Sequence, residues 1–191
     1  MRRIMFLAAA LLAGCSSAPE TTSALYLLPQ PESQTQTQTA EAITDRPLLV
    51  VRPVELASYL NNRGIVYRTS ESQVIQAKHN QWAQNLSEQI TQRVIADLRQ
   101  KQTHYWPVTV HNLLDQSSDD KLQLSLNKFN GNYQGNTEVE GEWMLIEANG
   151  KVKRRASVKI SVPLQDEGYD ALVEALAASL DDLTDAIAQQ L

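Results

Sequence analysis

Residues that usually carry enzyme chemistry are scarce in this sequence. It contains one cysteine, Cys15, and three histidines, His79, His104 and His111. The histidines fall outside the H-x-x-x-H and H-E-x-x-H spacings of zinc sites, and neither a G-x-S-x-G turn nor a glycine-rich phosphate loop occurs. The sequence therefore predicts no enzyme, no metal site and no cofactor held by protein side chains.

The chain also lacks the basic excess that a nucleic-acid-binding protein needs. Its 17 lysines and arginines are outnumbered by 22 aspartates and glutamates, which gives a net charge of −5. Because phosphates must be neutralised by a basic face, we expect no nucleic-acid partner. One basic cluster stands out, formed by Lys151, Lys153, Arg154 and Arg155. It is either the solvated arm of a hairpin that protects an edge strand, or a contact patch for an acidic partner or an anionic headgroup.

No apolar run reaches the roughly 20 residues that span a bilayer as a helix. A shorter run at residues 4–12 follows Arg2 and Arg3, as in a secretory signal, and leads into Leu12-Ala13-Gly14-Cys15. These four residues form a lipobox, the signature of a bacterial lipoprotein. We expect cleavage before Cys15, a diacylglycerol on its thiol and an acyl chain on the new amine. Ser16 in place of aspartate predicts sorting to the outer membrane, on its periplasmic face.

Lipidation of Cys15 leaves no thiol for a disulfide, so the mature domain must be stabilised by its core alone. Removal of residues 1–14 takes away two arginines and changes the net charge from −5 to −7. Residues 15–46 are predicted to be a lipidated tether. It holds a strand-like segment at residues 25–28 and a polar linker at residues 30–39, with a random-coil reach of roughly 25 Å. Residues 47–191 are predicted to form a single domain.

Within this domain, hydrophobic periodicity distinguishes strands from helices. Apolar runs and alternating segments predict strands at residues 48–51, 65–69, 73–76, 105–110, 122–126, 139–146 and 158–162. Pro107 favours a sheet edge, and Asn149-Gly150 is typical of a type I′ hairpin turn. Apolar residues every three or four positions predict a helix of about 18 residues from Trp82 and another over residues 172–191. The pattern predicts an α+β fold, with two amphipathic helices packed on a mainly antiparallel sheet.

Eight short motifs occur in order over nearly the whole chain. They are LAGCSS (12–17), YLLP (26–29), VELASYL (54–60), GIVYRTS (64–70), NQWA (80–83), FNGNY (129–133), GEW (141–143) and GYD (168–170). With these motifs the chain resembles the ABC-transport auxiliary lipoproteins of the PqiC (YmbA) type. Each motif alone is weak, and their common order makes the resemblance specific.

The resemblance implies a non-catalytic part of an intermembrane phospholipid-transport system. The implied partners are a PqiB-like protein, whose MCE domains form a tube across the periplasm, and a PqiA-like integral membrane protein. The lipoprotein would dock the distal end of this tube at the outer membrane and support envelope integrity. Because a tube end has rotational symmetry, a ring of several copies is expected.

The candidate partner-docking surface is the segment from Glu55 to Trp82. Its candidate contact residues are Tyr59, Arg63, Tyr67 and Trp82, and the three aromatic residues are predicted to be exposed between turns. The alternative is that this segment packs the first helix onto the sheet. A rival function is a periplasmic lipid-binding carrier with an acyl-sized cavity between the sheet and the last helix. A hydrolase is a third hypothesis, for which the sequence offers no nucleophile and base.

Overall fold

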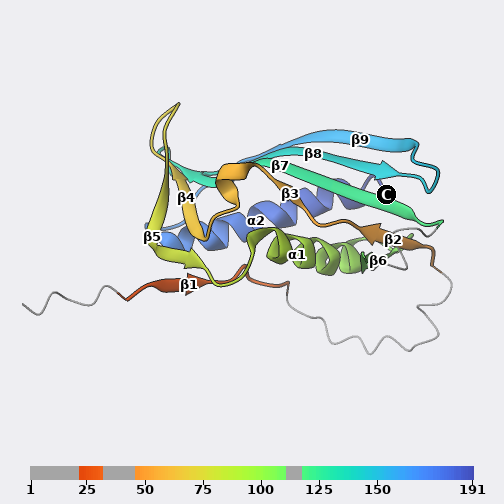
Figure 1. The fold of residues 1–191 in the computed structure, drawn as a ribbon, viewed down its shortest axis with the longest axis horizontal. Coiled ribbons are helices and arrows are strands. Elements are labelled where there is room, and N and C mark those ends of the chain that lie inside the picture. Colours follow the sequence, from red (N-terminus) through yellow and green to blue (C-terminus); the bar gives the residue numbers. More distant parts are fainter. Residues whose placement is uncertain (1–21, 32–45, 111–117) are drawn as a thin grey trace, which may run out of the picture.

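The computed structural model describes residues 22–31, 46–110 and 118–191 (Figure 1). The predicted signal peptide, Cys15, most of the polar linker and His111 lie outside these residues. The strands are β1 (Ala24–Tyr26), β2 (Leu48–Val51), β3 (Glu55–Leu56), β4 (Gly64–Arg68), β5 (Val74–Trp82), β6 (Trp106–Thr109), β7 (Asp120–Asn132), β8 (Thr137–Ile146) and β9 (Val152–Ile160). The helices are the 3-10 turn η2 (Ser58–Leu60), α1 (Leu86–Lys101) and α2 (Tyr169–Ala188).

The nine strands form one mixed sheet: its two longest pairings, β7–β8 and β8–β9, are antiparallel, but the prediction of a mainly antiparallel sheet missed the parallel strands. Its main path runs β1-β5-β4-β7-β2-β6, while β3 and β8 also pair with β7 and β9 pairs with β8. Five of the eight pairings are parallel. Strands that are distant in sequence enter the sheet through crossovers, and such connections produce parallel neighbours. As Pro107 predicts, β6 lies at an edge of the main path.

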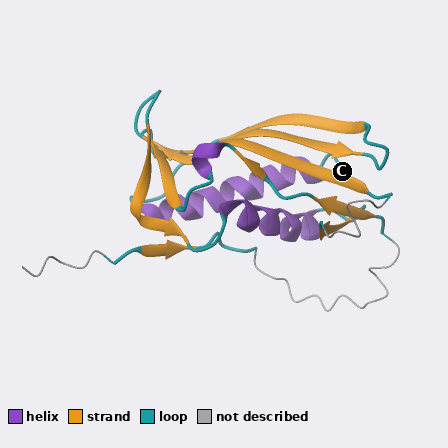
Figure 2. Cartoon of the chain, viewed as in Figure 1, coloured by secondary structure: helices purple, strands orange, loops and turns teal. Residues whose placement is uncertain are grey.

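Both long helices lie side by side on one face of the sheet (Figure 2). The predicted stripe of α1 is buried at Leu86, Ile90, Val94 and Leu98, and α2 buries its own stripe from Leu172 to Ile187. The Asn85 side chain begins α1 by accepting a hydrogen bond from the Glu88 amide, at 3.2 Å. Among the described residues, no helix has the length and apolar character needed to cross a membrane.

The longest strands form the meander β7–β8–β9, whose inner face carries the predicted alternation. Val139, Trp143 and Leu145 of β8 are fully buried against the helices. The turn between β8 and β9 is not type I′, because Asn149 lacks the positive φ that this turn requires. Instead, the Gly150 amide donates to the Glu147 carbonyl at 2.9 Å, and Gly150 alone adopts φ 85°. This is a three-residue loop with glycine in the left-handed position.

The strand–helix boundary near residue 82 also differs from the prediction. The strand predicted at residues 73–76 continues as β5 to Trp82, and α1 begins only at Leu86. The Trp82 side chain is 2% exposed and belongs to the core. The prediction that Trp82 lies at the surface is therefore wrong. Tyr26 of β1 lies opposite it in the parallel β1–β5 pair, and Trp82 belongs to the same core as Leu28 and Leu86.

The strand-like segment near residue 26 is part of the folded sheet. We call residues 24–29 the N-terminal strap. Its β1 portion pairs with residues 80–82 of β5, and the Tyr26 carbonyl accepts from the Ala83 amide at 2.8 Å. Leu28 is buried in the core, and its amide donates to Oε1 of Gln89 on α1 at 2.8 Å. The folded region therefore extends N-terminal of Pro47, where the sequence predicted its start.

Candidate functional site

The four predicted docking residues do not form one exposed surface. Tyr59 and Tyr67 are half-buried, Trp82 is buried, and only Arg63 is fully at the surface. The Tyr59 hydroxyl donates to the Asn127 carbonyl at 2.8 Å and also contacts Oδ1 of Asn130 at 3.3 Å. These contacts fix the η2 region onto β7. Three of the four residues are therefore held within the fold, and the alternative, that this segment packs the first helix onto the sheet, stays a prediction.

A buried polar cluster lies where β4 meets β7 and β8. The carboxylate of Glu138 accepts hydrogen bonds from the side-chain amides of Asn130 and Asn132, each at 3.2 Å, and pairs with Arg68. All three of Asn130, Asn132 and Glu138 are buried. Burial acts to raise the pKa of Glu138, but the hydrogen bonds from Asn132, Asn130 and Arg68 outweigh it, so the pKa is lowered. The cluster therefore holds an ionised carboxylate.

Sequence analysis missed Glu138, although a signal was present. The motif FNGNY places two asparagines at alternate positions of β7, so both side chains point to the same face of the sheet. An amide pair on one face of a buried strand requires hydrogen-bond partners, and Glu138 and Arg68 supply them. Arg68 also lies over the ring of Tyr133, 5.8 Å from its centroid. Three of the motifs thus contribute to this cluster or its border: FNGNY, GIVYRTS through Arg68, and VELASYL through the contact of Tyr59 with Asn130.

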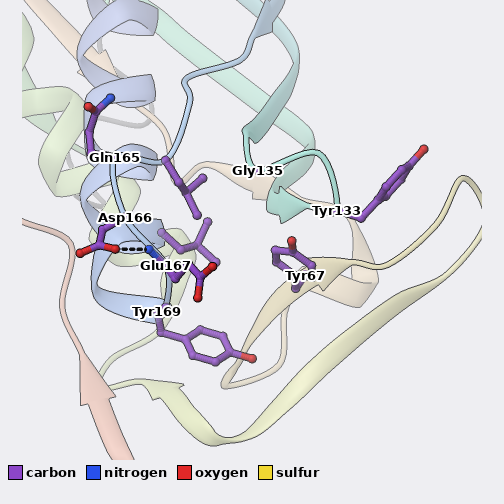
Figure 3. A pocket seen from close by; sticks show the side chains of 10 residues that line it. Tyr67, Tyr133, Gly135, Gln165, Asp166, Glu167 and Tyr169 are labelled. Carbon is purple, nitrogen blue, oxygen red and sulfur yellow. Dashed lines mark hydrogen bonds between the residues drawn. The ribbon is translucent and has the colours of Figure 1, made fainter.

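A cleft of about 640 Å³ opens beside this cluster (Figure 3). Tyr67 and Gly135 lie on one side of it, and the loop leading into α2 lies on the other. The ten lining residues are Tyr67, Tyr133, Gly135, Leu164, Gln165, Asp166, Glu167, Gly168, Tyr169 and Leu172. They include no histidine or cysteine, and the Asp166 carboxylate accepts from the Glu167 amide at 2.7 Å. This lining suits non-covalent binding, because it offers apolar surface and the hydroxyl groups of tyrosines.

Gly131 explains how the cleft side of the sheet packs so closely. A Cβ at this position would lie 2.8 Å from Cδ1 of Leu172 and 2.9 Å from Cδ2 of Tyr67. Such distances are too short for a methyl group, so only glycine lets α2 and β4 approach β7 here. The glycine of FNGNY therefore sets the spacing of the elements that border the cleft.

The basic cluster is divided by the geometry of the edge strand β9. Within the described residues, β9 pairs only with β8. The Nζ of Lys153 lies 3.1 Å from Oδ2 of Asp120, and Arg154 donates to the Gln190 carbonyl. Arg155 lies opposite Met144, and both Arg155 and Lys151 are exposed. Two of the four cations are thus tied to the fold, and two remain at the surface next to an edge.

Neither of the described histidines is placed in a cluster of metal ligands. His79 and His104 are both exposed, and the His104 ring contacts Tyr105 edge-on at 4.6 Å between centroids. Across residues 22–31, 46–110 and 118–191, no three His, Cys, Asp or Glu side chains are grouped so as to hold a metal ion.

Comparisons with known proteins agree on one family. A family model described as the ABC-type transport auxiliary lipoprotein component matches residues 26–188. The chain is 35% identical to the intermembrane transport lipoprotein PqiC of Escherichia coli strain K12, over 98% of this chain and 96% of that protein. PqiC of Shigella flexneri matches with the same identity and coverage.

Solved structures share the fold over most of its length. A crystal structure of an uncharacterised protein superposes with a TM-score of 0.75 at 27% identity, covering 88% of this chain and 98% of the other. A protein from Xanthomonas campestris superposes with a TM-score of 0.67 at 16% identity, covering 89% and 93% of the two chains. Because the family model and the curated relatives extend over nearly the entire sequence, this chain belongs to the ABC-type transport auxiliary lipoprotein family.

Proposed function

We propose that this protein is a non-catalytic outer-membrane lipoprotein that docks the distal end of a PqiB-like MCE protein. In this proposal Cys15 carries the lipid anchor, a PqiA-like membrane protein belongs to the same system, and several copies form a ring. The observation that carries it is the similarity to PqiC, an intermembrane transport lipoprotein, over 98% of the chain. Similarity of that extent includes the lipobox region as well as the domain.

The packing of the interior favours docking over the carrier hypothesis. A carrier needs an acyl-sized cavity between the sheet and α2. That space is occupied by side chains such as Trp143, Phe129 and Leu180, each no more than 2% exposed. The cleft near Tyr67 lies at the end of α2 and opens to the outside. Docking of a partner on the outer surface of the domain is therefore the function that this architecture supports best.

Two surface positions are the best places to test partner contact. Arg63 is the exposed member of the predicted docking set, and Arg155 is an exposed member of the basic cluster. Lys159 lies further along β9 and is also exposed, which makes it a matched control for a charge reversal on the same strand. Because an exposed charge contributes little to stability, reversals at these positions should leave the fold intact.

The test uses the full-length lipoprotein, extracted from membranes and mixed with the periplasmic part of the PqiB-like protein. We expect a stable complex on size exclusion, with light scattering reporting several lipoprotein copies and extraction recovering no stoichiometric lipid from the lipoprotein alone. Arg63→Glu or Arg155→Glu should weaken the complex, whereas Lys159→Glu should not. A monomer that ignores the partner and retains phospholipid would establish the carrier instead.

A further inference from the structure

Exposed apolar side chains gather at one end of this elongated domain. Among the described residues, five of the six large hydrophobic side chains that are strongly exposed belong to β1, β5 or their surroundings, each between 42% and 59% exposed. They are Leu25, Leu27, Val74, Ile75 and Tyr133. Figure 1 shows β5 and the start of β1 at one end of the molecule and the β8–β9 turn at the other. Exposed apolar groups of this kind mark contact sites for proteins or membranes.

The N-terminal chain leaves the fold at this same end. Because the strap fixes β1 onto β5, only residues 16–23 separate Cys15 from Ala24. A fully extended chain over that interval spans at most about 30 Å. The interval is therefore far shorter than residues 16–46, which would separate the anchor from the fold if the fold began at Pro47. An anchor at Cys15 must hold the β1–β5 end of the domain close to the membrane.

The two apolar residues at the start of β5 indicate a fluid surface as their partner. Val74 and Ile75 are consecutive in a strand, so their side chains point to opposite faces of the β4–β5 hairpin. A flat protein partner on one face would cover one of them. A bilayer interface into which the hairpin is pressed surrounds both. Tyrosine suits the same environment, and the Tyr133 hydroxyl is bonded to Glu71 of this hairpin at 2.5 Å.

We propose that the β1–β5 end, defined by Leu25, Leu27, Val74, Ile75 and Tyr133, lies in the phospholipid surface that holds the anchor. This rests on the proposed lipidation of Cys15. Apolar contact is the main interaction, with the exposed Lys78 of β5 able to extend its ammonium group to lipid phosphates. The β8–β9 end, with Lys151 and Arg155, then faces away from the membrane. Arg63, whose carbonyl accepts from the Trp82 amide, belongs to the β1–β5 end, so this orientation favours Arg155 over Arg63 as the partner contact.

The test compares two exposed apolar strand residues at opposite ends of the molecule. Ile75→Cys and Val152→Cys are made separately in the full-length lipoprotein, because both side chains are exposed to a similar degree. Lipidation blocks Cys15, so a polarity-sensitive fluorophore labels the new thiol alone. The labelled proteins are reconstituted into vesicles of phosphatidylethanolamine and phosphatidylglycerol that carry a quencher on the acyl chains. Val74→Cys probes the opposite face of the hairpin, and circular dichroism checks that each variant is folded.

We expect blue-shifted, quenched emission at positions 74 and 75 and unshifted, unquenched emission at position 152. Vesicle-bound protein with equal emission at all three positions would overturn the proposed surface while leaving the anchor intact. Quenching at position 152 alone would reverse the orientation and overturn it as well. If the protein fails to remain with vesicles, and Cys15→Ser behaves like the natural chain, the lipid anchor and the proposal that depends on it both fail.

Discussion

The N-terminal strap should open as a unit, separately from the rest of the domain, and Leu28→Ala should lower the cost of that opening. Leu28 is 2% exposed, so truncation removes a buried isobutyl group. Leucine-to-alanine changes in cores cost about 2–5 kcal/mol, with the lower values where the surroundings can collapse. A strap at the border of the core can relax, so we expect about 2–3 kcal/mol. The strap conformation should be destabilised by that amount.

Native-state hydrogen exchange measures this cost directly, because local openings expose only the amides that they release. The Ala83 amide donates to the Tyr26 carbonyl and reports on the strap, while the Val94 amide in the middle of α1 reports on the core. At about 1.4 kcal/mol per tenfold change, Leu28→Ala should accelerate exchange at Ala83 by roughly 30- to 150-fold. Exchange at Val94 should change much less.

Leu27→Ala is the matched control, since Leu27 is the neighbouring residue and is mostly exposed. A surface change of this kind is worth less than about 0.5 kcal/mol, so exchange at Ala83 should rise by less than about threefold. Equal acceleration at Ala83 and Val94 in Leu28→Ala would mean that the strap unfolds only with the whole domain. Unchanged exchange at Ala83 would mean that Leu28 does not hold the strap. Either result refutes the reasoning.

Three further predictions concern charge, backbone packing and the anchor. Because the pKa of Glu138 is lowered, its ionised form stabilises the fold above the ordinary glutamate pKa, and this contribution is lost as the pH falls through the lowered value. Glu138→Gln should therefore reduce the loss of stability in acid, measured by urea unfolding at several pH values. An unchanged pH profile would contradict this. Gly141→Ala should lower the urea midpoint more than Gly150→Ala, because a Cβ at Gly141 collides with the Ser125 carbonyl oxygen, whereas Gly150 has open space and costs about 1 kcal/mol through its positive φ alone. Equal midpoints would count against this. Cys15→Ser should move the full-length protein from the membrane fraction to the soluble fraction, and its retention with membranes would exclude lipidation as the main attachment.

Local patterns predicted the elements of this fold better than their arrangement. The alternation in β8 and the stripes of both helices match the observed burial, because each depends on residues a few positions apart. The direction of the strands could not be obtained in that way. Alternation looks the same in parallel and antiparallel strands, and the parallel β2–β6 and β2–β7 pairs depend on long connections.

In the candidate site too, local patterns indicated some residues, whereas their partners from distant parts of the sequence could not be predicted. The sequence around Trp82 suggests a surface aromatic between turns, but its surroundings in the fold come from distant parts of the sequence, such as Tyr26 and Leu28. Asn130 and Asn132 belong to the FNGNY motif, but their acceptor Glu138 lies across a β-turn and belongs to no motif. Arg63 is exposed, and its role in docking stays a prediction.

The parallel pairing of β1 with β5 also has a mechanical consequence. A lipid anchor at one end of the chain and a partner held at the other surface would place the domain under tension. A pull through the N-terminus acts along the direction of β1, so its hydrogen bonds to residues 80–82 are loaded in shear and share the force. These hydrogen bonds then resist the force together, whereas a strand pulled perpendicular to its axis would lose its hydrogen bonds one after another. The fold therefore places its most load-resistant geometry at the point where the tether enters.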